Sequence, residues 1–84
     1  MRYSLDFRKQ AFKELEKIDE PFYSNIKQAL FNLTENPRPV GYKKLKGGAG
    51  YRIRVGDYRV IYDIFDAELI IDVIMVGNRK DIYN

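Results

Sequence analysis

The sequence predicts an α+β fold in which a two-helix hairpin packs on one face of a mostly antiparallel four-stranded sheet. Two observations predict it. Residues 8–36 repeat apolar side chains three and four positions apart, which is typical of amphipathic helices. Residues 51–76 instead alternate apolar and polar side chains or run continuously apolar, as strands do. The resulting order, β-α-α-β-β-β, favours a sheet with its helices segregated to one side.

One strand and two helices are expected first. Residues 3–7 alternate apolar and polar side chains, which predicts a half-buried strand. Residues 8–18 have the spacing of an amphipathic helix. Asp19 is predicted to cap a second helix that has Pro21 in its first turn. This helix should end before Pro37, because the residue preceding a proline is pushed out of helical geometry.

Three strands are expected after a loop. Residues 51–62 alternate apolar and charged side chains around Gly56 and Asp57, which predicts a hairpin with a two-residue turn. Residues 69–76 are nearly all apolar, which predicts a central strand buried on both faces. The last residues, 77–84, are expected to be a polar tail.

The length and composition limit what kind of protein this is. A chain of 84 residues cannot divide its core in two, so we expect one domain, 1–84. Seven Tyr and five Phe supply large side chains for the core. No apolar run has the length of a membrane span, and the first residues lack the apolar core of a signal peptide. We therefore expect a cytoplasmic protein that does not bind membranes.

The absence of two residue types restricts the chemistry. Without cysteine there is no disulfide, thiolate nucleophile or cysteine-based zinc site, and without histidine there is no common general base near neutral pH. Catalysis would therefore depend on Lys, Arg, Tyr, Asp or Glu. Asp63 and Asp72 are the carboxylates that we weighed as metal ligands, but two without a matching Glu or His make a weak site, and ion pairs with nearby arginines are favoured. We expect no metal and no cofactor.

Positive charge is concentrated in the middle of the chain. The formal net charge is +3, yet residues 38–59 contain a single acidic residue, Asp57, against seven basic ones: Arg38, Lys43, Lys44, Lys46, Arg52, Arg54 and Arg59. The flanking segments are neutral or acidic. This pattern favours a phosphate-bearing or acidic partner for the middle segment.

Three arginines are predicted to share one face of the hairpin. With Gly56 and Asp57 in the turn, Arg54 lies opposite Arg59, and Arg52 lies two residues away on the same face. Like charges across a strand pair destabilise it by a few tenths of a kcal/mol or more, so the pair indicates a bound anion, with phosphate as the natural candidate. The alternative is a merely solvated face, which is the more frequent explanation for any single surface arginine.

The loop and the tail supply further candidates. Lys43, Lys44 and Lys46 lie in a glycine-rich loop, with at most a short strand about Leu45, and ordinary solvation and RNA binding are equally supported for them. Nothing in this loop has the spacing of a nucleotide-binding motif, so its glycines are interpreted as flexible. In the tail, Arg79 and Tyr83 would reach the arginine face if the tail folds back. A frayed terminal tyrosine is the alternative for Tyr83.

The sequence resembles the RelE/ParE toxin superfamily of type II toxin-antitoxin systems. Three segments carry the resemblance: KLKG at residues 44–47, YRIRVGDYRVIY at 51–62 and VGNRKDIY at 76–83. The resemblance extends over nearly the whole chain and implies the same β-α-α-β-β-β order. It also implies a cognate antitoxin protein as partner, which would hold the toxin silent.

Site residues follow from the resemblance to RelE-like members. Arg52 and Arg54 take two positions at which those toxins carry lysine, Arg59 and Arg79 take those of two phosphate-stabilising arginines, and Tyr83 takes that of a terminal tyrosine. The implied reaction is cleavage of mRNA on the ribosome by attack of a ribose 2′-OH on the adjacent phosphate. A guanidinium is a poor proton acceptor because its pKa lies above about 12. Tyr83, acidified by neighbouring cations, is therefore our hypothesis for the general base.

Two other functions are open at this point. ParE-like members of the superfamily poison DNA gyrase on a similar scaffold, and the replacement of lysine by arginine at positions 52 and 54 favours that alternative. The joint presence of Arg59, Arg79 and Tyr83 favours the ribosome-dependent endoribonuclease. A nucleic-acid-binding module without catalysis is the third candidate, and it predicts no growth arrest.

Overall fold

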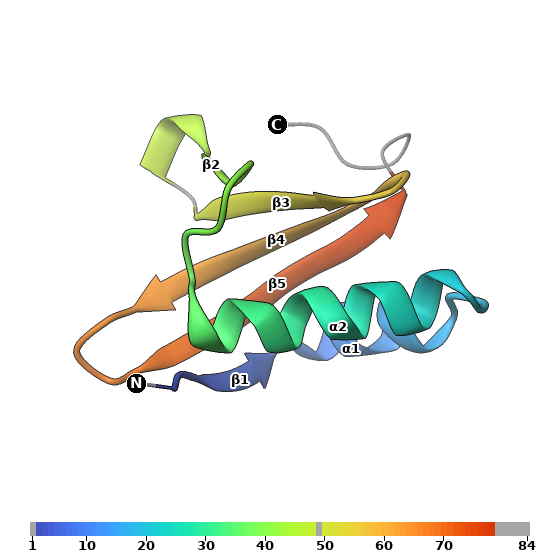
Figure 1. Cartoon of the computed structure of the whole chain (residues 1–84), viewed down its shortest axis with the longest axis horizontal. Helices are drawn as coiled ribbons and strands as arrows, with labels where there is room; N and C mark the ends of the chain where they lie inside the picture. Colours follow the sequence, from blue (N-terminus) through green and yellow to red (C-terminus); the bar gives the residue numbers. More distant parts are fainter. Residues whose placement is uncertain (1, 49, 79–84) are drawn as a thin grey trace.

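The computed structural model describes residues 2–48 and 50–78 and shows a curved five-stranded sheet with two helices (Figure 1). The strand order is β1-β5-β4-β3-β2, and all neighbouring pairs are antiparallel except β1 with β5. The strands are β1 (Ser4–Phe7), β2 (Lys43–Lys44), β3 (Tyr51–Val55), β4 (Tyr58–Phe65) and β5 (Ile70–Asn78). The helices are α1 (Lys9–Glu16) and α2 (Phe22–Glu35), and a short 3-10 turn, η1, spans Lys46–Gly48. The α+β class and the predicted element order are confirmed.

The prediction of four strands is wrong, because a fifth strand forms in the predicted loop. Lys43 pairs with Arg52 and Lys44 with Tyr51, which adds β2 to the free edge of β3. Leu45, about which a short strand was expected, lies just outside β2 and donates its N–H to the carbonyl of Gly50 at 3.0 Å. A strand of two lysines has no apolar alternation, so its pattern does not distinguish it from a loop.

Two details of β5 also differ from the prediction. The strand is not buried on both faces: Ile71, Val73 and Val76 are buried, whereas Asp72 is partly exposed. The strand also continues for two residues into the predicted tail, because Gly77 and Asn78 still pair with β4. Its partly exposed face therefore extends alongside the hairpin arginines.

The helices have the predicted places but a different N-terminal cap. Pro21, and not Asp19, is the N-cap residue of α2, and the carboxylate of the preceding Glu20 accepts hydrogen bonds from the backbone N–H of Ser24 at 3.0 Å and from the Ser24 hydroxyl at 2.8 Å. Pro21 precedes the first helical residue instead of lying in the first turn. The helix ends at Glu35, as expected from Pro37.

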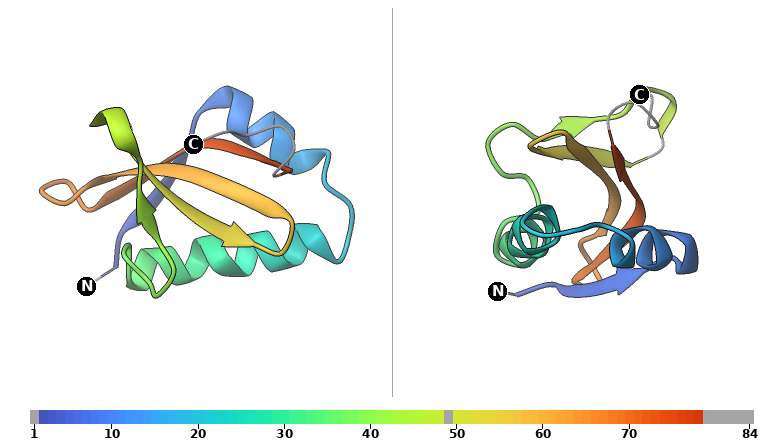
Figure 2. Two further views of the ribbon diagram at one scale, coloured as in Figure 1. Left: turned by 90° about the horizontal axis from the view of Figure 1, so that it is seen from above. Right: turned by 90° about the vertical axis from the view of Figure 1, so that its right-hand side faces the viewer.

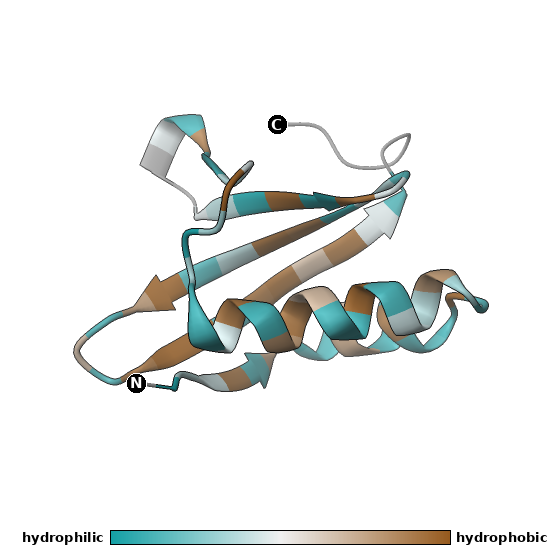
Figure 3. Cartoon of the chain, in the orientation of Figure 1, coloured by the Kyte–Doolittle hydropathy of each residue, from teal (hydrophilic) through white to brown (hydrophobic). Residues whose placement is uncertain are grey.

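The core lies between the helices and one face of the sheet. Buried residues of both helices and of β3, β4 and β5 form one cluster: Ala11, Leu15, Ile26, Leu30, Leu33, Ile53, Val60, Tyr62, Ile71, Val73 and Val76. Figure 3 shows the alternation of apolar and polar residues along the strands and α2 that produces this core. In the right-hand view of Figure 2 the sheet curves from β1 at the bottom to β2 at the top, with α2 seen nearly end-on. None of the helices in the described part of the chain has the length and apolar character of a membrane-spanning segment.

Gly50 has a structural role that the interpretation as a flexible loop missed. Its φ is +82°, and a Cβ at this position would lie 2.7 Å from the backbone oxygen of Tyr62. A side chain would therefore clash with backbone on β4 in addition to straining its own backbone. Only glycine lets the chain pass this close to β4 before it enters β3.

Candidate functional site

The hairpin of β3 and β4 places the arginines as predicted. Arg54 pairs with Arg59 and Arg52 with Ile61, so the predicted register is confirmed. Ile53 and Val60, which pair with each other, belong to the core. Because successive side chains of a strand point to opposite faces, the arginines lie on the face turned away from that core. We call this surface the open face.

Strand β2 adds one lysine to the same surface. Lys43 pairs with Arg52, so the two side chains share the open face, whereas Lys44 pairs with Tyr51 on the opposite side of the ribbon. Lys43, Arg52, Arg54 and Arg59 together form what we call the cationic half of the open face. Three adjacent strands thus contribute four cations to one surface.

Arg52 is the most enclosed member of the cationic half. Only 3% of its surface is exposed, and no described residue accepts a hydrogen bond from its Nε. Burial is the main reason why the pKa of this guanidinium is lowered, and the charges of Arg54 and Arg59 lower it further. The alternative of a merely solvated arginine face is therefore wrong for Arg52. A buried cation among like charges is costly without an anion nearby.

The other two hairpin arginines are more accessible. Arg54 is exposed, and Arg59 is partly exposed and pairs across β4 and β5 with Gly77. Arg54 therefore borders solvent, and Arg59 lies directly opposite it on the same surface.

The predicted lysines are only partly brought to this site. Lys43, Lys44 and Lys46 are all exposed, and none of the four ion pairs between described side chains includes them. Lys43 alone shares the face of the arginines; Lys46 begins the turn η1. Arg79 and Tyr83 lie outside the described residues, so their place in the site stays a prediction.

A row of aspartates crosses the opposite end of the open face. Asp6 on β1 pairs with Asp72 on β5, which in turn pairs with Asp63 on β4. Arg8 forms an ion pair with Asp72 at 3.0 Å, in line with the predicted ion pairing of that residue. Asp63 instead accepts a hydrogen bond from the backbone N–H of Ile64. We call Asp6, Asp63 and Asp72 the acidic half of the open face.

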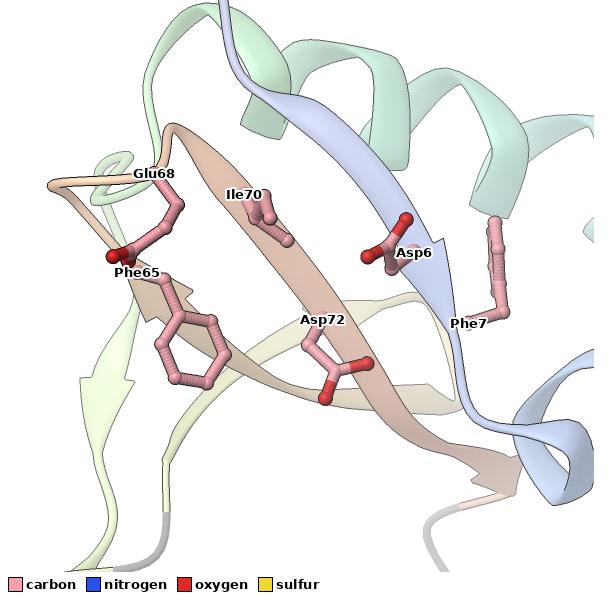
Figure 4. A pocket seen from close by; sticks show the side chains of 6 residues that line it. All are labelled: Asp6, Phe7, Phe65, Glu68, Ile70 and Asp72. Atoms are coloured by element: carbon pink, nitrogen blue, oxygen red, sulfur yellow. The ribbon is translucent and has the colours of Figure 1, made fainter.

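A shallow hollow of about 580 Å³ adjoins the acidic half (Figure 4). It is lined by Asp6, Phe7, Phe65, Glu68, Ile70 and Asp72. Across residues 2–48 and 50–78, no group of three or more His, Cys, Asp or Glu side chains is arranged to hold a metal ion. That the site needs no metal stays a prediction.

A network around Arg38 was missed by the sequence reading. Arg38 forms an ion pair with Asp66 at 3.0 Å, and Asp66 also accepts a hydrogen bond from the Tyr3 hydroxyl at 2.6 Å. The hydrogen bond from Arg38, followed by that from Tyr3, lowers the pKa of Asp66. The network joins the residue before β1, the segment after α2 and the turn between β4 and β5. Its members are up to 63 residues apart in sequence, so no local pattern could have revealed it.

Comparison with known proteins places this architecture and its basic hairpin in one family. Residues 5–83 match the family model of the ParE toxin of type II toxin-antitoxin systems, parDE. The mRNA interferase toxin RelE of Escherichia coli is 32% identical over 83 residues, which cover 95% of this chain and 86% of that protein. The chain therefore belongs to the RelE/ParE superfamily of toxins from type II toxin-antitoxin systems.

Solved structures agree with this assignment. The archaeal RelE-RelB complex from Pyrococcus horikoshii contains a chain that is 28% identical, with a TM-score of 0.82. The match covers 98% of this chain and 100% of that one. The intact Escherichia coli RelBE toxin-antitoxin complex contains a chain that is 33% identical, with a TM-score of 0.80, covering 90% of this chain and 95% of that one. The likeness extends over nearly all of the sheet and both helices.

Proposed function

We propose that this chain is a type II toxin that inhibits translation as an mRNA interferase, a metal-independent endoribonuclease that cleaves mRNA on the ribosome. The pairing of Arg54 with Arg59 on the open face, directly beside the buried Arg52, carries the proposal. The 32% identity to the mRNA interferase toxin RelE supports it. We further propose that residues 1–84 form a single domain that acts in the cytoplasm.

The proposed reaction uses the RNA's own hydroxyl as nucleophile. The ribose 2′-OH attacks the adjacent phosphorus, a 2′,3′-cyclic phosphate forms, and the 5′-oxygen of the next nucleotide leaves with a proton. Negative charge increases on the phosphoryl oxygens in the transition state, and preorganised cations stabilise it there. Arg59 and Arg79 are assigned this role, Arg54 offers a further guanidinium to the backbone, and Lys43, Lys44 and Lys46 are assigned to RNA binding.

The proton of the 2′-OH needs an acceptor. Burial and two like charges lower the pKa of Arg52, but a guanidinium starts so high that it stays protonated near neutral pH. We therefore assign Arg52 to charge stabilisation and Tyr83 to the role of general base. A Tyr83→Phe variant that cleaves mRNA at the wild-type rate would remove Tyr83 from this role.

A cognate antitoxin is the proposed protein partner. Structures of RelE-RelB and RelBE complexes exist for similar chains. Residues 38–59 carry seven basic residues against Asp57, so an acidic segment of the antitoxin would suit this surface and would cover the cationic half. Silencing then follows from competition between the antitoxin and RNA for the same charges.

DNA gyrase is the second candidate target. Two observations favour it: the matching family model describes the parDE toxin, and positions 52 and 54 carry arginine instead of lysine. The two targets separate in cells, because a gyrase poison damages DNA and induces the SOS response whereas an mRNA interferase blocks translation.

Mapping of mRNA 5′ ends tests the proposal. The wild-type chain, Arg59→Ala and Arg79→Ala are expressed under tight control, and primer extension is run on translated messages. We expect cuts within codons that disappear when translation initiation is blocked and in both variants. Growth arrest with intact mRNA would instead support the gyrase target, and normal growth with intact mRNA would support a binding module without catalysis.

A further inference from the structure

A stack of three tyrosines extends from the core to the edge of the sheet beside β2. The rings of Tyr51 and Tyr62 are stacked with centroids 5.9 Å apart, and the ring of Tyr42 follows at 6.1 Å from Tyr51, tilted by 42° against it. We call these three rings the tyrosine stack. Tyr62 is fully buried, Tyr51 is partly buried, and 37% of Tyr42 is exposed. The outermost ring of the stack therefore borders solvent.

The inner rings of the stack are held in place by polar contacts. The Tyr62 hydroxyl donates a hydrogen bond to the carbonyl of Pro37 at 2.7 Å. The guanidinium of Arg38 lies 5.7 Å from the centroid of the Tyr51 ring, and its ion pair with Asp66 fixes it there. Because both inner rings are anchored, little order remains to be imposed on them when a ligand stacks on the outer one.

Tyr42 is held through its backbone and through ring contact. Its N–H donates to the carbonyl of Pro39 at 3.0 Å, and its ring contacts Tyr51. With 37% of the residue exposed, Tyr42 stays accessible to a ligand at the edge of the sheet.

The surroundings of Tyr42 are cationic. Lys43 and Lys44 follow it directly, and both are exposed. Pairing places Lys44 on the side of Tyr51 and Lys43 on the side of Arg52, so the two lysines flank the edge of the sheet between the tyrosine stack and the cationic half. The tyrosines and the arginines lie on opposite faces of the sheet, and β2 is the edge strand around which a chain could pass from one face to the other.

We propose that Tyr42 is a stacking subsite for a nucleobase of single-stranded RNA that passes around the β2 edge from the cationic half. This inference rests on the proposed function, because it takes RNA as the ligand of the open face. An exposed aromatic ring beside cations that follow the backbone is the arrangement by which proteins bind single strands without reading their sequence. The subsite holds the strand outside the reacting nucleotides and leaves the chemistry to the arginines.

Binding of a non-cleavable RNA tests the subsite. The probe is a short 2′-O-methyl RNA with 2-aminopurine at successive positions, titrated with the isolated chain. We expect the wild type to quench one position strongly, and Tyr42→Leu to lose that quenching and bind on the order of tenfold more weakly. Tyr42→Phe keeps the ring and should retain both properties. Phe31→Leu, which changes an aromatic residue of α2 that is 57% exposed, is the matched control and should bind as the wild type does.

Two results would overturn the subsite: binding and quenching by Tyr42→Leu equal to those of the wild type, or no quenching at any position by the wild type itself. Ultraviolet crosslinking of the wild-type chain to 5-iodouridine RNA needs no substitution, and it should modify Tyr42. A crosslink map that lacks Tyr42 would also contradict the subsite. The mRNA cuts described above are measured separately, so the proposed function can stand when the subsite fails.

Discussion

The two ends of the open face are built on the same strand but carry opposite charge. On β4, Arg59 and Asp63 point to the same face four residues apart, which is about 13 Å along a strand. Buried Ile61 lies between them. Each charge faces a like charge on a neighbouring strand, Arg54 for Arg59 and Asp72 for Asp63. Sheet pairing therefore concentrates each sign instead of neutralising it.

The difference between the halves lies in how the like charges are relieved. In the acidic half, Arg8 approaches Asp72 at 3.0 Å and offsets part of the repulsion. In the cationic half, Arg52 is buried, and the pKa of its guanidinium is lowered first by burial and then by the charges of Arg54 and Arg59. A bound anion would therefore be stabilised more strongly at the cationic half than at the acidic half, because it offsets the buried charge of Arg52. The acidic half would repel phosphate, so the proposed RNA backbone is expected at the other end.

The largest expected effect comes from removing one arginine of the cationic half. Arg59→Ala should slow mRNA cleavage by about 100-fold or more, as loss of one preorganised donor to a developing charge typically does. Arg8→Ala removes an arginine from the acidic half and is the matched control. It should cleave within a few-fold of the wild type on programmed ribosomes, and an equal loss in both variants would contradict the distinction between the halves.

The burial of Arg52 should be visible in the pH dependence of cleavage. Burial, followed by the charges of Arg54 and Arg59, lowers the pKa of Arg52 and should lower that of a lysine at the same position, so Arg52→Lys should lose its proton at a lower pH than an exposed lysine does. We expect a new inflection in the rate against pH. Arg54→Lys places the lysine at an exposed position and should leave the profile unchanged. The same profile for both variants would mean that burial of Arg52 does not matter to the reaction.

The repulsion within the acidic half predicts a small gain in stability. Asp63→Asn removes one of two like charges that face each other across β4 and β5, and should raise the free energy of unfolding by a few tenths of a kcal/mol. Asp72→Asn should lower it, because Arg8 loses its partner. Urea denaturation distinguishes these signs. Cleavage by Asp63→Asn should equal that of the wild type.

The smallest expected effect concerns the ion pair between Asp66 and Arg38, whose guanidinium lies over the ring of Tyr51. The pKa of Asp66 is lowered by Arg38 first and by Tyr3 second. A carboxyl group with a lowered folded-state pKa contributes stability above its unfolded pKa, about 3.9, and loses it as the pH falls through the folded value. Asp66→Asn should therefore lower the Tm near pH 6, and the difference should shrink below pH 4. A Tm difference that persists in acid would show that charge is not its cause.

The hairpin was predictable from the sequence because its determinants are local. Strict alternation and the two-residue turn at Gly56 and Asp57 decide which side chains face each other, and the pairing of Arg54 with Arg59 follows. The element order was predictable for the same reason. Strand β2, formed by Lys43 and Lys44, was not predictable, since two residues of one type carry no periodicity.

What sequence could not supply depends on contacts between distant segments. The row of Asp6, Asp72 and Asp63 requires the parallel pairing of β1 with β5, whose register no local pattern sets. The burial of Arg52 likewise depends on tertiary structure, because alternation assigns a residue to a face and does not reveal how that face is covered. The placement of the hairpin arginines on one face was thus predictable, and the burial of Arg52 was not.

The salt dependence of RNA binding tests the central claim most directly, namely that the cationic half holds the RNA backbone. The affinity of a non-cleavable single-stranded RNA is measured at several salt concentrations for the wild type, Arg54→Ala and Arg8→Ala. Each phosphate contact to a single strand contributes about 0.7 to the slope of log affinity against log salt. We predict that Arg54→Ala reduces the slope by about that amount and that Arg8→Ala does not. An unchanged slope in Arg54→Ala, or an equal reduction in Arg8→Ala, would contradict the account.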